Sequence, residues 1–167
     1  MPSPGPELPA HLWKHCLLKI NDTHLFMAGG EDNLARSKKA YLLNTKTMEW
    51  TRIPDMRRQR SEHGCAMLDG DKVIVVGGFR AFGFKPKSEI LSLNTLTWSE
   101  GPLDPEIHFE LSLVPYGDTV LTVETGPLKS TMLKLDREQN AFVDFLDVES
   151  FNGGSVIPLP NDYPASC

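Results

Sequence analysis

The chain has 167 residues, of which 40% are hydrophobic and 23% charged, and its formal net charge is −5. This composition is ordinary for a globular domain, and the negative charge disfavours general binding to nucleic acid. No apolar stretch is long enough to span a membrane, and the proline-rich first ten residues lack the features of a secretory signal. The compartment is therefore unknown, and it is cytoplasmic if the chain is complete.

Along the chain, one pattern occurs twice at an offset of 48 residues. The apolar segment 25–30 aligns with 73–78, and each of these segments ends in two glycines. The repeated positions are Gly29 with Gly77, Gly30 with Gly78, Trp50 with Trp98, and His15 with His63. A period of this length is typical of the blades of a β-propeller.

A weaker third copy follows at the same offset. Residues 121–126 align with the glycine-ended strand but keep only the second glycine, Gly126. This copy has no tryptophan at the position that corresponds to Trp50 and Trp98, and Phe142 is the nearest aromatic replacement. We expect Val75 and Val123 to lie on equivalent inner strands.

Each copy is predicted to form four short strands. In the second copy, these are residues 64–68, 73–76, 90–93 and 97–99, separated by turns rich in Gly, Asp, Asn and Pro. The continuous β-branched segment 73–76 predicts a strand that is covered on both faces. Glycine directly after such a strand permits a backbone conformation or a close approach that a side chain would prevent.

This pattern resembles the kelch repeat, in which an apolar strand is followed by Gly-Gly, a variable loop, a further apolar strand and then Trp. The resemblance implies an all-β fold made of kelch-type propeller blades with four antiparallel strands each. Propellers typically close with about four to eight blades, so we expect an incomplete propeller. The chain would then be a piece of a longer protein or an incomplete gene model. The alternative is an open half-propeller that associates with itself. The total number of blades and the oligomeric state stay open.

The predicted organisation follows the repeats. It comprises the tail of a preceding blade (1–13), repeat 1 (14–56), repeat 2 (57–105), a degenerate repeat 3 (106–149) and the truncated start of a further repeat (150–167).

The three cysteines predict neither a metal site nor a disulfide. Cys16 and Cys65 lie on the first strands of neighbouring copies but are 49 residues apart, one out of register. Since successive side chains of a strand point to opposite faces, we expect these two thiols not to meet. No Cys-x-x-Cys or His-x-His spacing is present, and no cofactor is expected.

The repeated histidine and tryptophan positions favour structural roles. His63 is expected to make a hydrogen bond that ties a blade to a loop. Trp50 and Trp98 are expected to be buried anchors, each packed against its own blade. The structural positions are Gly29, Gly30, Trp50, His63, Gly77, Gly78 and Trp98.

Two loops next to the second glycine pair are candidates for binding. The kelch resemblance implies that both open on the same face of the blades. The inter-blade loop 55–62 and the post-glycine loop 79–87 together carry several arginines and phenylalanines, which are frequent hot-spot residues of interfaces. The candidate residues are Arg57, Arg58, Arg60, Phe79, Arg80, Phe82, Phe84 and Lys85. The alternative is that the phenylalanines pack inward and the cations are merely solvated.

The resemblance implies a protein-interaction module that displays these loops to a protein or an acidic peptide, without enzymatic activity. The net charge and the lack of a long apolar stretch predict no binding to nucleic acid or membrane. Self-association through open blade edges is a further expectation. The second hypothesis is a fragment of a carbohydrate-acting propeller enzyme, similar to galactose oxidases or sialate mutarotases. The sequence does not identify the partner or the pathway.

Overall fold

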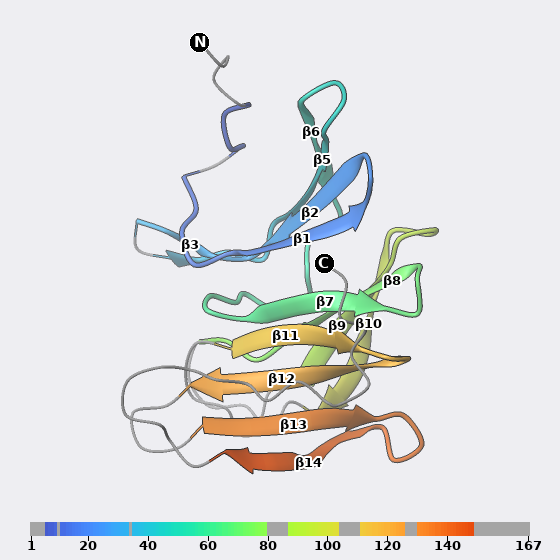
Figure 1. Ribbon diagram of the computed structural model, residues 1–167. Coiled ribbons are helices and arrows are strands. Elements are labelled where there is room, and N and C mark those ends of the chain that lie inside the picture. The colour runs from blue at the N-terminus through green and yellow to red at the C-terminus, as the bar shows by residue number, and fades with distance from the viewer. Residues whose placement is uncertain are drawn as a thin grey trace.

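The computed structural model describes residues 6–9, 11–33, 35–79, 87–103, 111–125 and 130–148, and all regular structure in these ranges is β-strand (Figure 1). The strands form three consecutive four-stranded antiparallel units, which we call blades. Blade 1 contains β1 (Cys16–Asn21), β2 (His24–Ala28), β5 (Ala40–Asn44) and β6 (Glu49–Ile53), with the short hairpin β3 (Glu31–Asp32) and β4 (Ala35–Arg36) after β2. The predicted start of a further repeat at 150–167 lies outside the described residues.

Blades 2 and 3 repeat this order. Blade 2 contains β7 (Gly64–Leu68), β8 (Lys72–Val76), β9 (Lys87–Ser92) and β10 (Thr97–Leu103). Blade 3 contains β11 (Leu111–Tyr116), β12 (Thr119–Thr125), β13 (Ser130–Asp136) and β14 (Ala141–Val148). The all-β fold and the four-stranded units agree with the prediction, and β12 carries Val123 as β8 carries Val75.

Blades 2 and 3 join at their outer strands, where Leu103 of β10 forms a parallel bridge to Ala141 of β14. Their first strands, β7 and β11, also lie side by side (Figure 1). The eight strands therefore form one nearly closed sheet, a feature that the repeat pattern did not predict.

The register explains why the aromatic position recurs. Trp50 on β6 pairs with Leu43, Trp98 on β10 pairs with Leu91, and Phe142 on β14 pairs with Leu135. An aromatic residue thus lies opposite leucine in each blade. Phe142 is the equivalent of the tryptophans in blade 3.

The glycine pairs recur because the backbone requires them. Gly30 and Gly78 have φ values of 95° and 90°, a region that residues with a Cβ rarely adopt. A Cβ at Gly30 would lie 2.7 Å from the carbonyl oxygen of Trp13, and one at Gly78 would lie 2.6 Å from that of Ser61. Each glycine therefore lets the chain that enters its blade pass directly over the end of the second strand.

Two apolar clusters hold the blades together. Between blades 1 and 2, Phe26 and Met56 pack with Val73, Val75 and Leu91. Between blades 2 and 3, the cluster comprises Ala66, Leu68, Ile74, Val76, Leu111, Val120 and Leu135. We call these two regions the 1–2 interface and the 2–3 interface.

The expectation that Cys16 and Cys65 do not meet is wrong, because their Sγ atoms are bonded across the 1–2 interface, with the Cα atoms 6.0 Å apart. Stacked blades turn opposite faces toward each other. Side chains that meet between two blades therefore lie on opposite faces of equivalent strands. In the sequence such residues are 49 apart, one more than the repeat offset of 48. The 2–3 interface follows the same rule, since a Cβ at Gly64 would lie 2.2 Å from Cδ1 of Leu113, 49 residues later.

Candidate partner-binding site

The arginine loop, which we define as residues 54–63, connects β6 of blade 1 to β7 of blade 2. Several backbone hydrogen bonds fix it to blade 1, and two of them involve Arg60. The Gly30 amide donates to the carbonyl oxygen of Arg60 at 2.8 Å, and the Arg60 amide donates to that of Ser37 at 3.0 Å. This loop therefore belongs to the 1–2 interface as well as to the surface above it.

Arg60 is fully buried, which corrects its assignment to a displayed surface. Its guanidinium donates to the carboxylate of Glu89 at 3.3 Å and to the carbonyl oxygen of Gly77 at 2.9 Å, and it also contacts the carbonyl of Lys87. A charge with this many internal partners is a structural element, since offering it to a partner protein would leave Glu89 buried and unpaired.

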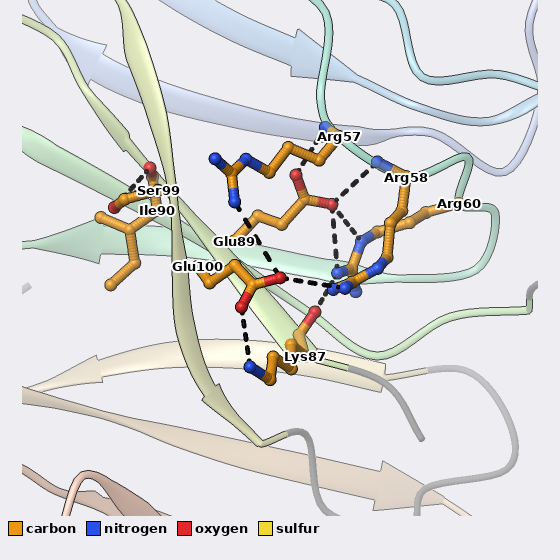
Figure 2. A network of polar contacts seen from close by, with 8 residues as sticks. All are labelled: Arg57, Arg58, Arg60, Lys87, Glu89, Ile90, Ser99 and Glu100. Atoms are coloured by element: carbon orange, nitrogen blue, oxygen red, sulfur yellow. Dashed lines mark hydrogen bonds and ion pairs between the residues drawn. The ribbon is translucent and has the colours of Figure 1, made fainter. Parts of the chain in front are cut away.

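The carboxylate of Glu89 on β9 binds the backbone of the arginine loop (Figure 2). Besides binding Arg60, its carboxylate accepts the backbone amide of Arg57 at 2.6 Å and that of Arg58 at 3.2 Å. The buried carboxylate thus holds the backbone that carries the next two arginines, so their position depends on blade 2 as well as on the loop itself.

The side chains of Arg57 and Arg58 extend from this fixed backbone toward Glu100 on β10 (Figure 2). Arg58 lies 3.1 Å from the Glu100 carboxylate, Arg57 lies 3.9 Å away, and Lys87, at the far end of the post-glycine loop, lies 2.7 Å away. We call these four residues the Glu100 cluster. The hydrogen bond from Lys87, followed by the charges of Lys87 and Arg58, lowers the pKa of the Glu100 carboxyl below its ordinary value.

Phe79 adjoins the arginine loop on its other side. It forms an antiparallel bridge with Ser61, and 36% of its surface is exposed. The Arg36 guanidinium lies 5.5 Å from the centre of its ring, a cation–π contact that links the β3–β4 hairpin of blade 1 to blade 2. The remaining predicted residues, Arg80, Phe82, Phe84 and Lys85, lie outside the described residues.

Ser61 and Glu31 connect the two loops further. The Ser61 hydroxyl donates to the Glu31 carboxylate at 2.7 Å, and the indole of Trp13 donates to the same carboxylate at 3.2 Å. These two hydrogen bonds, that of Ser61 above all, lower the pKa of the Glu31 carboxyl. The equivalent bridges Trp13–Glu31 and Ser61–Phe79 therefore form one row across the loops of both blades.

His63 makes the kind of hydrogen bond that its repeated position suggests, because its Nε2 lies 3.1 Å from the carbonyl oxygen of Ala28 in the preceding blade. Burial, followed by the nearby Arg60 cation, lowers the pKa of His63 to about 3. The neutral ring must donate through Nε2, and Nδ1 has no hydrogen-bond partner among the described residues. His63 is therefore a tie between blades and not a free acid or base.

The tryptophans differ from the expectation of buried anchors on their own blades. Both are only half-buried. Trp98 contacts Phe26 of blade 1, at 6.3 Å between ring centres, and its indole N–H donates to the carbonyl oxygen of Pro54 at 2.8 Å. Trp50 packs edge-on against Tyr41 of its own blade. Trp98 thus holds two blades together.

Sequence reasoning missed Glu89 and Glu100, the two carboxylates that organise the site. The available signal was the position of Glu89, an acidic residue directly before the apolar predicted strand 90–93. Acidic residues are almost never fully buried unless they are paired, so its position predicts a buried cation nearby.

Other kinds of site have no candidate among the described residues. No group of three or more His, Cys, Asp or Glu side chains in this part of the chain could hold a metal ion. Within the same residues, no helix is long and apolar enough to cross a membrane.

No family model matches the chain, but curated proteins do. It is 26% identical to Kelch-like protein 41b of Danio rerio over 117 residues, which are 70% of this chain and 19% of that protein. It is 26% identical to Kelch-like protein 40 of Xenopus tropicalis over 148 residues, 87% of this chain and 23% of that protein. An F-box/kelch-repeat protein of Arabidopsis thaliana is 30% identical over 81 residues, 47% of this chain and 23% of that protein.

The chain thus spans about a fifth of the length of these relatives. Four-stranded blades, the repeated glycine pairs and these matches define a kelch-type β-propeller fold. Over the part that the matches cover, the chain is similar to kelch-repeat proteins.

Proposed function

We propose that the chain is a protein-interaction module whose arginine loop and post-glycine loop bind an acidic segment of a partner protein. The observation that carries the proposal is the Glu100 cluster, in which three cations share one carboxylate. Kelch-like and F-box/kelch-repeat relatives support a binding role over an enzymatic one, and the carbohydrate-enzyme alternative has no support among them.

The charges of this region favour a carboxylate ligand. Among the described residues, Arg60 is neutralised by Glu89, whereas Arg57, Arg58 and Lys87 share Glu100, so this part of the structure carries two positive charges in excess. The side chain of Arg57 is 55% exposed and that of Arg58 is 35% exposed, so parts of both are accessible from the surface. Arginine can bind a carboxylate through two parallel hydrogen bonds, so the cluster can accept a second carboxylate beside Glu100.

Phe79 adds apolar contact area next to this charge, and Arg80, Phe82, Phe84 and Lys85 remain part of the proposed surface. Aromatic residues and arginine dominate the energy of many interfaces. The proposed ligand is therefore a peptide with several carboxylates and at least one apolar side chain that can lie against Phe79.

The proposal can be tested with charge-reversed variants. Binding of a library of Asp- and Glu-rich peptides, with and without aromatic residues, would be measured by fluorescence anisotropy at several salt concentrations. Arg58→Glu combined with Arg80→Glu should weaken binding by about tenfold or more and reduce its dependence on salt.

The matched control is Lys19→Glu combined with Lys46→Glu, which changes the net charge equally. Lys19 and Lys46 are exposed, and they lie near the turns at the other end of blade 1, where Thr45 donates to the carbonyl of Thr23. The control should bind like the unaltered chain. Equal loss of binding in both variants would contradict a specific site, as would undiminished binding of the Arg58 and Arg80 variant.

Self-association is a second candidate, favoured by the face of blade 1 that points away from blade 2. There Leu17 on β1 is 56% exposed, and the buried Nε1 of Trp50 lacks a partner among the described residues. Sedimentation of the chain and of Leu17→Lys would test this. The unaltered chain should form dimers that the variant does not form, and a monomeric unaltered chain would exclude the idea.

A further inference from the structure

Cys16 and Cys65 tie blade 1 to blade 2 at the first strand of each. Cys16 on β1 is 7% exposed, and Cys65 on β7 is half-buried and packs against the same apolar cluster. Among the described residues this disulfide is the only covalent link between blades, apart from the chain itself. It closes a segment that contains the rest of blade 1 and the whole arginine loop.

We propose that the Cys16–Cys65 disulfide is a redox-controlled lock that holds blade 1 against blade 2 when oxidised and releases it when reduced. The remaining side-chain ties across this interface include two neutral hydrogen bonds, from His63 to Ala28 and from Trp98 to Pro54. A crosslink between residues 49 apart restricts the unfolded chain and thereby stabilises the folded one. This contribution to the free energy of unfolding is larger than that of one such hydrogen bond. The interface should therefore depend on the oxidation state.

The lock also acts on the loops above it. The hydrogen bond from Ser61 to Glu31 and the bond from the Gly30 amide to Arg60 cross from blade 1 to the arginine loop. Arg57 and Arg58 are held on blade 2 by Glu89. Release of blade 1 should therefore separate the β3–β4 hairpin from the arginine loop and leave the Glu100 cluster in place.

The chemistry is thiol–disulfide exchange with a small disulfide such as oxidised glutathione. The thiolate of one cysteine attacks the small disulfide, forms a mixed disulfide and displaces one small thiolate. The second cysteine thiolate then attacks the protein sulfur of that mixed disulfide and displaces the second small thiolate, so two protein thiols are oxidised and one small disulfide is reduced to two thiols. Cys16 is 7% exposed and Cys65 is half-buried, so the first attack is expected at Cys65.

The first test identifies the bond. The chain would be equilibrated in ratios of reduced to oxidised glutathione, its free thiols blocked with an alkylating reagent, and its peptides analysed by mass spectrometry without reduction. A peptide linking Cys16 to Cys65 is expected to accumulate as the oxidised fraction rises. Absence of that peptide at every ratio would overturn the proposal.

The second test measures the lock. Reduction should lower the melting temperature of the unaltered chain by about 10 °C and speed hydrogen exchange at the Gly30 amide, which bonds across the blades. Amides of β12 that bond to β11 lie within blade 3 and are the internal control. Unchanged melting and unchanged exchange at Gly30 after complete reduction would also overturn the proposal.

Variants separate the lock from general effects of reduction. Cys16→Ala and Cys65→Ala should each melt near the reduced chain and show no response to reductant, whereas Cys167→Ser should respond like the unaltered chain. A response that persists in Cys65→Ala would contradict the assignment. If Cys16→Ala does not fold, the comparison of the unaltered chain with and without reductant decides the outcome.

Discussion

The two blade interfaces use the same backbone geometry with different chemistry. The 1–2 interface has a disulfide between Cys16 and Cys65, and the 2–3 interface places Gly64 against Leu113 at the positions 48 residues later. In the first interface His63 lies over Gly29, whereas in the second Leu111 lies over Gly77. The repeat therefore fixes which positions meet but not what kind of interaction they make.

The two interfaces also differ in the charged groups and backbone contacts that they contain. The arginine loop crosses the 1–2 interface and brings with it the buried Arg60 and Glu89. In the 2–3 interface, the outer strands are joined directly by the bridge from Leu103 to Ala141. Among the described residues, the charged contact there is a surface pair in which Arg137 binds both carboxylate oxygens of Asp69 at 2.6 Å. Solvent and salt screen such a surface pair more than they screen the buried pair of Arg60 and Glu89. We therefore expect the 1–2 interface to be the more sensitive to polar substitutions.

The largest effect should come from breaking the buried ion pair. Arg60→Met leaves Glu89 buried without its cation and should reduce the free energy of unfolding by about 3–5 kcal/mol. The double variant Arg60→Met with Glu89→Leu should recover a large part of this loss, because no unpaired charge remains. Urea denaturation of the two single variants and the double variant would measure the coupling. Simple additivity of the single losses would contradict a direct pairing.

The two equivalent glycines offer a matched test of the interfaces. Gly29 and Gly77 have nearly equal φ values, 68° and 72°, so alanine strains the backbone equally at both. A Cβ at Gly29 would lie 2.3 Å from the His63 ring and 2.7 Å from the backbone carbonyl oxygen of Arg60. The atoms nearest to a Cβ at Gly77 belong to the Leu111 side chain, at 2.9 Å. We expect Gly29→Ala to cost about 3 kcal/mol and Gly77→Ala about 1–2 kcal/mol.

Thermal denaturation of the two alanine variants provides the comparison. The order of the losses matters more than their size, since both variants carry the same backbone strain. A larger loss for Gly77→Ala would show that the apolar 2–3 interface is the more rigid of the two.

The tryptophan pair tests the hydrogen bond across the 1–2 interface. Trp98→Phe removes the bond to the Pro54 carbonyl and should cost about 1–2 kcal/mol. Trp50→Phe removes an N–H that has no partner among the described residues and should cost less. Chemical denaturation of the two variants would give the difference. Equal losses of unfolding free energy in the two variants would mean that Trp98 stabilises the chain by packing and not by this hydrogen bond.

The last effect concerns pH and is absent above pH 6.5. Burial lowers the pKa of His63 in the folded chain to about 3, against an ordinary value of 6.5. The unfolded chain therefore binds a proton more readily, and the stability from neutral His63 is complete above pH 6.5 and is lost as the pH falls toward 3. His63→Gln should reduce the slope of unfolding free energy against pH in this window, whereas His15→Gln, at the equivalent position, is the control. An unchanged slope in His63→Gln would contradict a buried neutral ring.

Much of the fold could be predicted because local rules determine it. The positive φ values of the glycine pairs, the β-branched segment 73–76 and the recurrence of Trp50 at Trp98 are properties of one blade, and one blade lies within one repeat. Alignment at one offset was therefore enough to identify the strands and their order. The weaker third copy still forms a blade because Phe142 takes the aromatic position.

The site was predictable only in part. The basic loop and the post-glycine loop were evident as segments, but the role of each arginine depended on a carboxylate far along the chain. Arg60 meets Glu89 across 29 residues, and Arg58 meets Glu100 across 42 residues. Spacing within the loop could not distinguish the buried Arg60 from the more exposed Arg57 and Arg58.

The sequence by itself determined the blade, because strand alternation, turns and glycine conformation act over a few residues. The tertiary structure alone decided how blades face each other. Stacking turns the opposite faces of equivalent strands toward one another, and this brought Cys16 to Cys65 although their register in the repeat predicted that they would not meet. It also decided which cations are neutralised and which stay at the surface, since burial and charge pairing depend on neighbours that the chain brings together only when it folds.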